Sequence, residues 1–186
     1  MTKSEIRKEI RNRQSGLSRQ WIETTSNAVQ KRLLALPEFE DAGVVGCYMA
    51  VETEVRTNLI IEECLKEDRK LFLPAISSNG DFYEMTEYRR GTSLKAGPFG
   101  VPEPVEGERI LAGKVELMVT PGLAFDRFGG RVGHGGGHYD RMMQGEDGSC
   151  FKAAIAFEFQ MFDKVPVEKQ DVLMNAVITE AETVRC

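Results

Sequence analysis

The sequence predicts a single-domain α/β fold with a mainly parallel central sheet flanked by helices. Three observations support this prediction. The chain has 186 residues, which is the size of one domain, so we treat residues 1–186 as one unit. Apolar residues make up 41% and charged residues 28% of the chain, which is typical of globular proteins and argues against disordered or collagen-like chains. Short β-rich apolar runs alternate with amphipathic helical patterns, as expected for parallel strands joined by helices.

The first 36 residues carry two helical patterns. In residues 4–14, Ile6 and Ile10 are four apart on one helical face, and Ser4 is the expected N-cap. Ser18 should cap a second helix that ends before Pro37. The expected core-facing stripe of this second helix consists of Trp21, Ile22, Ala28, Val29, Leu33 and Leu36.

Apolar runs without a helical period predict the strands. They lie at residues 44–50, 70–74, 82–88, 115–120, 152–157 and 176–179. Thr57 should cap a helix between the first two runs, another helix should follow His138, and residues 89–113, rich in Gly and Pro, should form a loop. Together, these strands and helices predict a Rossmann-like three-layer architecture. Ligands of such sheets bind beyond the C-terminal ends of the strands, so we expect the site at the loops after Ala50 and Thr120.

Charge and hydropathy restrict the classes of function. Residues 1–32 hold eight Lys or Arg and three Glu, a net charge of +5, whereas the remainder carries -10. Such asymmetry is typical of a nucleic-acid-binding arm or of a small basic site for a phosphorylated ligand, and the acidic remainder disfavours a long polyanion. No apolar stretch approaches the roughly 20 residues that cross a bilayer, and the N-terminus lacks a secretory pattern. We expect a cytoplasmic protein, monomeric, with no nucleic-acid or membrane partner.

The cysteines show no pattern of a metal site or a redox pair. None of them forms a Cys-x-x-Cys motif or a Cys/His cluster with zinc spacing. We therefore expect reduced thiols at Cys47, Cys64, Cys150 and Cys186.

A glycine-rich segment is the most unusual part of the sequence, because residues 129–148 hold eight of the 18 glycines. Glycines let successive backbone N–H groups point into one concavity, and such a nest binds anions, especially where a helix N-terminus follows, as predicted near His138. The spacing fits neither a Walker A motif nor the Gly-x-Gly-x-x-Gly fingerprint. An ordinary glycine-rich surface loop therefore stays the alternative to a phosphate site. Arg131 and Arg141 add positive charge, and Asp140 is either a Mg²⁺ ligand beside phosphates or a partner of the helix N-terminus.

The same segment resembles the signature of the 5-formyltetrahydrofolate cyclo-ligases, also called methenyltetrahydrofolate synthetases. Their pattern is Pro-Gly, Phe-Asp, and an Arg two residues before Gly-x-Gly-x-Gly-x-Tyr-Asp. It is matched here by Pro121, Gly122, Phe125, Asp126, Arg131, Gly133, Gly135, Gly137, Tyr139 and Asp140. Further similarity extends over the chain, at Lys3, Arg7 and residues 48–57, 100–104 and 176–179.

The resemblance implies an enzyme that uses ATP and Mg²⁺ to convert 5-formyltetrahydrofolate into 5,10-methenyltetrahydrofolate, releasing ADP and phosphate. Phosphorylation of the formyl oxygen would activate the formyl carbon, and folate N10 would then close the ring. No nucleophilic side chain is required, because phosphoryl transfer is catalysed mainly by alignment and charge neutralisation. The alternative is a module that binds folate or nucleotide without turnover.

The resemblance also assigns residues to the site. The catalytic residues would be Lys3 and Arg131. The nucleotide site would comprise Lys3, Arg7, Arg131, Gly133, His134, Gly135, Gly136, Gly137, His138 and Tyr139. The folate site would comprise Met49, Glu54, Phe99, His134, Gly135, Gly136, Gly137 and His138. Taken without the resemblance, Met49 would be read as a core residue, Glu54 as a solvated carboxylate, and Phe99 as a loop anchor.

Asp140 and Asn175 are the metal ligands that the resemblance implies. The chain departs from the usual family pattern here, because Asn175 replaces an Asp, Gln170 replaces a His and His138 replaces an aromatic residue. An amide offers only a neutral oxygen, so Mg²⁺ would depend more on Asp140 and on the phosphates of ATP. The glycines between His134 and His138, the only two histidines, argue against a zinc pair.

Overall fold

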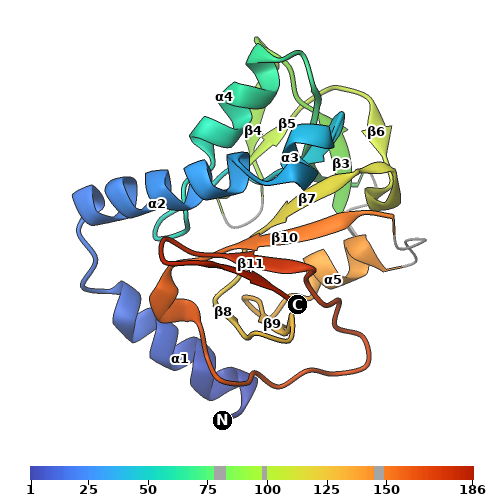
Figure 1. Ribbon diagram of the computed structural model, residues 1–186. Coiled ribbons are helices and arrows are strands. Elements are labelled where there is room, and N and C mark those ends of the chain that lie inside the picture. The colour runs from blue at the N-terminus through green and yellow to red at the C-terminus, as the bar shows by residue number, and fades with distance from the viewer. Residues whose placement is uncertain (78–82, 98–99, 145–148) are drawn as a thin grey trace.

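The computed structural model describes residues 1–77, 83–97, 100–144 and 149–186. Within these ranges the chain forms an eight-stranded sheet of order β12-β11-β10-β7-β1-β2-β3-β6 (Figure 1). The inner strands are all parallel: β11 (Ala176–Ile178), β10 (Phe151–Ile155), β7 (Leu117–Thr120), β1 (Val44–Gly46) and β2 (Lys70–Ile76). The outer strands pair antiparallel: β12 (Thr183–Arg185), β3 (Tyr83–Glu87) and β6 (Arg109–Ile110). The predicted α/β fold with a mainly parallel sheet is confirmed.

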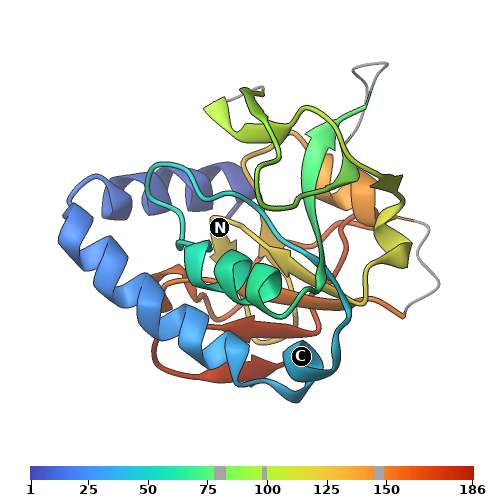
Figure 2. The same cartoon turned by 90° about the horizontal axis from the view of Figure 1, so that it is seen from above.

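Three helices cover one face of the sheet: α2 (Arg19–Leu34), α3 (Pro37–Asp41) and α4 (Asn58–Lys66). The helices α2 and α4 lie side by side, as Figure 2 shows from above. The strands bury both faces with a period of two, because Leu71 and Leu73 pack under these helices while Phe72 packs on the opposite face. Each such side chain contributes roughly 1.5–3 kcal/mol by leaving water.

The stripe of α2 differs in part from the prediction. Ser18 caps the helix as expected, accepting a hydrogen bond from Trp21 N at 3.1 Å, but Trp21 and Ala28 are exposed. Their places in the buried stripe are taken by Ser26 and Gln30. These two polar residues accept hydrogen bonds from the backbone N–H groups of Arg56 and Leu59 at the start of α4, so burial here serves polar pairing between helices as well as apolar packing.

The opposite face carries α5 (His138–Met143), the 3-10 helix η2 (Ala112–Lys114) and a hairpin of β8 (Ala124–Phe125) and β9 (Arg131–Val132). The N-terminal helix α1 (Lys3–Gln14) packs on this hairpin, through Ile6 and Ile10. Its N-cap is Thr2 and not Ser4, because Thr2 and Glu5 satisfy each other's backbone N–H groups in a capping box.

The predicted loop at residues 89–113 contains short strands. β4 (Leu94–Ala96) pairs with β5 (Pro102–Pro104), and β6 and η2 follow. Strands this short carry no readable period, and prolines are tolerated in a two-stranded edge. The prediction also missed β8, β9, β12 and the 3-10 helix η3 (Glu158–Gln160), and Pro37 begins α3 in addition to ending the preceding pattern. Thr57 precedes α4 as predicted, although its hydroxyl donates to Tyr48 O at 2.6 Å.

Two further expectations can be compared with the structure. None of the four cysteines, all of which lie in the described ranges, forms a disulfide, and three of them are buried. No helix in the described part of the chain is long and apolar enough to cross a membrane.

The topology places a crevice at the carboxyl ends of β1 and β7. From β1 the chain passes through α4 to β2 on one side, whereas β7 leads to β10 on the other side. Adjacent parallel strands whose connections diverge leave room for a ligand between their loops. The loops that follow these two strands therefore meet at the position predicted from the sequence.

Candidate active site

Two adjoining pockets lie at this edge of the sheet. The first has a volume of about 460 Å³ and the second about 440 Å³. They have common lining residues in and beside the glycine-rich loop 133–137: Arg131, Gly133, Gly136, Gly137 and Asp140. Ligands in the two pockets would therefore meet at this loop.

Aromatic rings form much of the first pocket. Tyr48 comes from the loop after β1, Tyr83 from the start of β3, and His138 and Tyr139 from the start of α5. The rings of Tyr83 and His138 meet edge to face, with centroids 5.2 Å apart. Burial raises the pKa of Tyr48 and of Tyr139 well above that of a free phenol, so both hydroxyls stay neutral. Such walls suit a flat heteroaromatic ligand.

Glu54 supplies a carboxylate to the first pocket. Its Oε2 accepts a hydrogen bond from Val51 N at 3.0 Å, in a turn where Glu52 takes a left-handed conformation, with φ 44°. Burial raises the pKa of Glu54 to about 7, because a low-dielectric environment disfavours the charged form. Near neutral pH this group can accept hydrogen bonds as a carboxylate or donate one as an acid.

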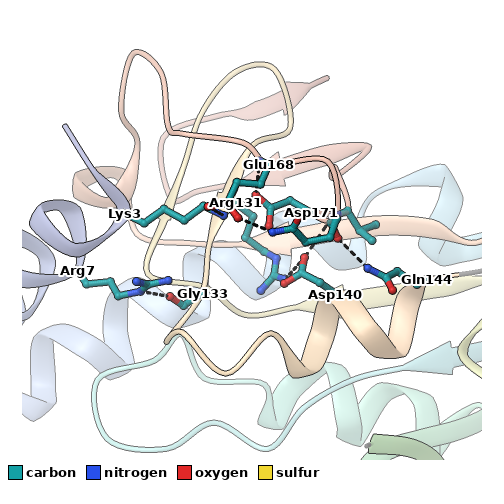
Figure 3. Close-up of polar contacts among 10 residues, drawn as sticks. Lys3, Arg7, Arg131, Gly133, Asp140, Gln144, Glu168 and Asp171 are labelled. Carbon is teal, nitrogen blue, oxygen red and sulfur yellow. Dashed lines mark hydrogen bonds and ion pairs between the residues drawn. The ribbon is translucent and has the colours of Figure 1, made fainter.

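The helix α1 presents two cations to the second pocket, as Figure 3 shows. Lys3 Nζ lies 2.6 Å from Asp171 Oδ2 and 3.2 Å from Glu168 Oε1. One helical turn on, Arg7 Nε donates to Gly133 O at 2.8 Å. Burial acts to lower the pKa of Lys3, but its hydrogen bonds to Asp171 and Glu168 outweigh this and raise the pKa. Both side chains therefore offer positive charge to an anionic ligand.

Arg131 lies at the junction of the two pockets. Its side chain is only 4% exposed, and Nη2 donates to Asp140 Oδ1 at 2.8 Å (Figure 3). Its guanidinium also lies 5.7 Å from the ring centroid of Tyr139. In the described structure, Arg131 Nε is buried without a hydrogen-bond partner. A buried unpaired donor is costly, so Arg131 is held here at the expense of stability.

The glycine loop presents a backbone with few side chains to both pockets. Gly135 and Gly137 adopt φ of 114° and 64°, a region that L side chains rarely take. A Cβ on Gly136 would lie 2.3 Å from His138 Cε1. The helix that follows is shorter than the dipole argument assumed, because α5 has six residues and ends where Gln144 becomes extended. Binding of an anion here would therefore depend mainly on the loop and its cations.

The structure brings together most of the predicted site residues. Lys3, Arg7 and Gly135 line the second pocket. Met49, Glu54, His134, His138 and Tyr139 line the first pocket. His134, His138 and Tyr139, which were expected in the nucleotide site, thus line the same pocket as the expected folate residues Met49 and Glu54. Phe99 falls outside the described residues.

Asn175 is not part of this site. It lines neither pocket, and its Oδ1 accepts a hydrogen bond from Lys152 N at 2.8 Å. It precedes β11, and the amino ends of parallel strands lie at the opposite edge of the sheet from the carboxyl ends of β1 and β7. The expectation that Asn175 is a metal ligand is therefore wrong for this structure.

Asp140 and Asp171 fit a Mg²⁺ site. No group of three or more His, Cys, Asp or Glu residues in the described ranges could hold a metal ion. Protein-bound Mg²⁺, however, commonly uses one or two carboxylates together with substrate phosphates. Both aspartates line the second pocket, so they provide this incomplete donor set.

Sequence reasoning missed Asp171, Glu168, Tyr48 and Tyr83 as lining residues. Tyr48 lies two residues after the end of β1, so the crevice rule could have indicated it. Glu168 and Asp171 belong to a segment without helices or strands, and only its fold around α1 brings them to Lys3. No local pattern in the sequence could have located them.

Comparison with known proteins yields consistent matches over the chain. Residues 1–180 match the sequence profile of the 5-formyltetrahydrofolate cyclo-ligase family. The 5-formyltetrahydrofolate cyclo-ligase of Haemophilus influenzae is 28% identical, over 91% of this chain and 93% of its own. The mouse protein of that name is 26% identical, over 94% and 92%. The solved structure of Aquifex aeolicus 5,10-methenyltetrahydrofolate synthetase is 34% identical, with a TM-score of 0.87, covering 100% of this chain and 93% of that one.

Proposed function

The chain belongs to the 5-formyltetrahydrofolate cyclo-ligase family, and we propose that it converts 5-formyltetrahydrofolate into 5,10-methenyltetrahydrofolate with ATP as the phosphate donor. One observation carries the assignment of the two substrates. A pocket lined by aromatic rings and a carboxylate adjoins a pocket lined by cations, and Arg131 lies where they meet. This arrangement suits the transfer of a phosphoryl group from one ligand to the other.

We assign the folate to the first pocket. The walls of Tyr48, Tyr83 and Tyr139 can enclose the flat pterin. Ionised Glu54 is an acceptor for adjacent N–H groups on the pterin edge. Met49, from the same loop as Glu54, adds a polarizable apolar contact.

We assign the triphosphate of ATP to the second pocket. Lys3 and Arg7 would neutralise phosphate oxygens, and the backbone from Gly133 to Gly137 can approach them closely because it carries few side chains. Arg131 would contact the γ-phosphate at the junction, because it lines both pockets. Asp140 and Asp171 would hold Mg²⁺, which neutralises and orients phosphates when bound.

The proposed reaction has two steps. The formyl oxygen attacks the γ-phosphorus while the bond to the ADP oxygen breaks, which turns the formyl oxygen into a leaving group. Folate N10 then attacks the formyl carbon and loses its proton, and the C–O bond breaks with release of phosphate. The protein acts by aligning the reactants and by placing Arg131 beside the charge that develops.

The test is formation of the methenyl chromophore from 5-formyltetrahydrofolate in the presence of ATP and Mg²⁺, with omission of each component in turn. Lys3→Ala should raise the KM for ATP or lower kcat. Lys8→Ala is the matched control, because it removes the same charge from an exposed position of the same helix. Binding of folate and ATP without chromophore formation would instead indicate a module without turnover.

A further inference from the structure

We infer that Gln144 makes the second pocket selective for adenine over purines that carry an oxygen at position 6, by presenting a fixed amide to the edge of the base. The inference rests on the assignment of ATP to this pocket and adds a specificity-determining residue to it. Gln144 directly follows the last residue of α5, and no sequence pattern assigned it to a site.

The lining of the second pocket has a charged part and a neutral part. Among the lining residues that the structure describes, every residue other than glycine carries a charge, except Gln144 and Gln170. Arg141, the nearest cation along α5, reaches back to the glycine loop, because a Cβ on Gly137 would lie 3.1 Å from its Nη1. Phosphates need cations, whereas an uncharged base is recognised well by amide groups. We therefore place the base beside the two glutamines.

The position of Gln144 agrees with this placement. Along α5, the residues common to both pockets end at Asp140, and Gln144 lies about one helical turn further on and lines the second pocket alone. In Figure 3, Gln144 lies on the side of Asp140 opposite Lys3 and Arg7. With the γ-phosphate at the junction of the pockets, the base is the far end of the nucleotide and would reach this part of the lining.

The amide of Gln144 is held in one orientation. Its Nε2 donates to the backbone carbonyl oxygen of Gln170 at 3.0 Å (Figure 3). Because a carbonyl oxygen only accepts, turning the amide over would place two acceptors face to face. The side chain of Gln170 donates to Glu168 Oε2, which restrains the residue that orients Gln144. The contact uses one N–H of the amide and leaves Oε1 and the second N–H for a ligand.

This edge of the amide matches adenine. Oε1 would accept from the 6-amino group, while the N–H would donate to a neighbouring ring nitrogen, which is the pairing that glutamine side chains make with adenine in nucleic acids. Guanine and hypoxanthine carry a carbonyl oxygen at position 6, so that oxygen would face Oε1 of Gln144 as a second acceptor. Unpaired polar groups left in such a contact reduce the affinity.

The experiment is calorimetric titration of the Mg²⁺ complexes of ATP and ITP, without folate, into the wild type and Gln144→Leu. ITP differs from ATP only at the edge that Gln144 would contact, where it has a 6-oxo group and a protonated N1. The quantity compared is the Kd for ITP divided by the Kd for ATP. We expect a ratio of about ten or more in the wild type. In Gln144→Leu the ratio should fall close to one, mainly through weaker binding of ATP.

Two further variants are the controls. Gln20→Leu makes the same change at an exposed position of α2 that lines neither pocket. Gln170→Ala removes a side chain but keeps the backbone carbonyl that orients Gln144. Both should keep the wild-type ratio. Gln144 is exposed, so Gln144→Leu should unfold at the wild-type temperature, and thermal denaturation checks this.

The other outcomes contradict the inference. If Gln144→Leu keeps the ratio, or weakens ATP and ITP equally, Gln144 does not contact the edge of the base. If only Gln170→Ala loses the ratio, the side chain of Gln170 selects the base instead. A wild type that binds ATP and ITP equally well would leave the ATP assignment intact and overturn the inference alone. A wild type that binds neither would overturn both.

Discussion

Glu54 combines an unfavourable environment with a functional position. The carboxyl group is largely buried between the loop after β1 and the aromatic walls of the first pocket, and its pKa rises to about 7. An ionised group in such a place destabilises the ligand-free protein, yet the charge is what the pterin that we assign to this pocket would require. Functional sites commonly contain groups that lower the stability of the fold because binding or activity needs them.

Glu54→Gln should therefore stabilise the protein in a pH-dependent way. The folded protein binds the Glu54 proton more tightly than the unfolded chain does, so stability is lost as the pH rises toward and through about 7. Gln cannot ionise, and we expect a gain on the order of 1–3 kcal/mol at pH 8 and almost none at pH 5. Urea unfolding followed by the fluorescence of the single tryptophan, Trp21, measures this.

The same substitution should raise the KM for 5-formyltetrahydrofolate at pH 8, because an amide cannot accept from two N–H groups as a carboxylate does. If Glu54→Gln stabilised the protein equally at pH 5 and pH 8, the gain in stability would not come from the charge of Glu54.

Gly135 has a φ of 114° and lines only the second of the two pockets. Gly135→Val should lower kcat about 100-fold or more, because a β-branched residue cannot adopt this backbone and the phosphates lose their alignment. Folate binding should stay within a few-fold of wild type. Gly16→Val is the control, since a Cβ there meets nothing within 4 Å. Folate affinity that collapses together with ATP turnover would contradict the separation of the pockets.

At the scale of elements, α1 is unusual because it packs through Ile6 and Ile10 on the β8–β9 hairpin and not mainly on the central sheet. Its polar face is thereby free to carry Lys3 and Arg7 into the second pocket. The first turn of a helix is its least stable part, and here that turn holds Lys3. The capping box therefore supports Lys3 in the second pocket, which we assign to ATP.

Thr2→Ala should weaken ATP binding although Thr2 lines neither pocket. Loss of the cap costs about 1 kcal/mol and frays the turn that holds Lys3, so the KM for ATP should rise several-fold with kcat little changed. Ser4→Ala is the control, because the sequence also suggested Ser4 as the N-cap and the structure does not use it. Equal effects of the two substitutions would exclude capping as the cause.

The sequence predicted the elements that have their own periodicity and missed those that exist only through pairing. The stripe of Ile6 and Ile10 predicts α1, but nothing local reveals that its partner is a hairpin of two-residue strands. The site follows the same division. The glycine loop and Lys3 could be assigned by resemblance, whereas Asp171 comes to Lys3 from a segment 168 residues away in the chain.

At the scale of the whole molecule, Asp126 joins the two walls of the second pocket. It is 1% exposed, and its Oδ1 accepts from Phe128 N at 2.9 Å and from Gly130 N at 2.8 Å. Its Oδ2 accepts from Val165 N at 2.9 Å. The hairpin that carries Arg131 is thus tied to the segment that carries Glu168 and Asp171.

Asp126→Asn should loosen this connection. An amide keeps one acceptor and turns a donor toward a backbone N–H, so we expect a loss of roughly 2–3 kcal/mol in the free energy of unfolding. The KM for ATP should rise more than the KM for folate, measured below the unfolding transition. Asp163→Asn, at an exposed position two residues before Val165, is the control. Equal changes in both KM values would mean that Asp126 only stabilises the fold.

The backbone common to both pockets has a consequence for how the two substrates affect each other. Residues Gly133, Gly136 and Gly137 line both cavities, so whichever ligand arrives first restricts glycines whose freedom the second ligand would otherwise have to restrict. Free energy is a state function, so the factor by which bound ATP raises the affinity for folate must equal the factor by which bound folate raises the affinity for ATP. Through this short stretch of glycine backbone, we expect each substrate to bind more tightly when the other is present. The complex that holds both donor and acceptor would then be favoured over the complex that holds ATP alone.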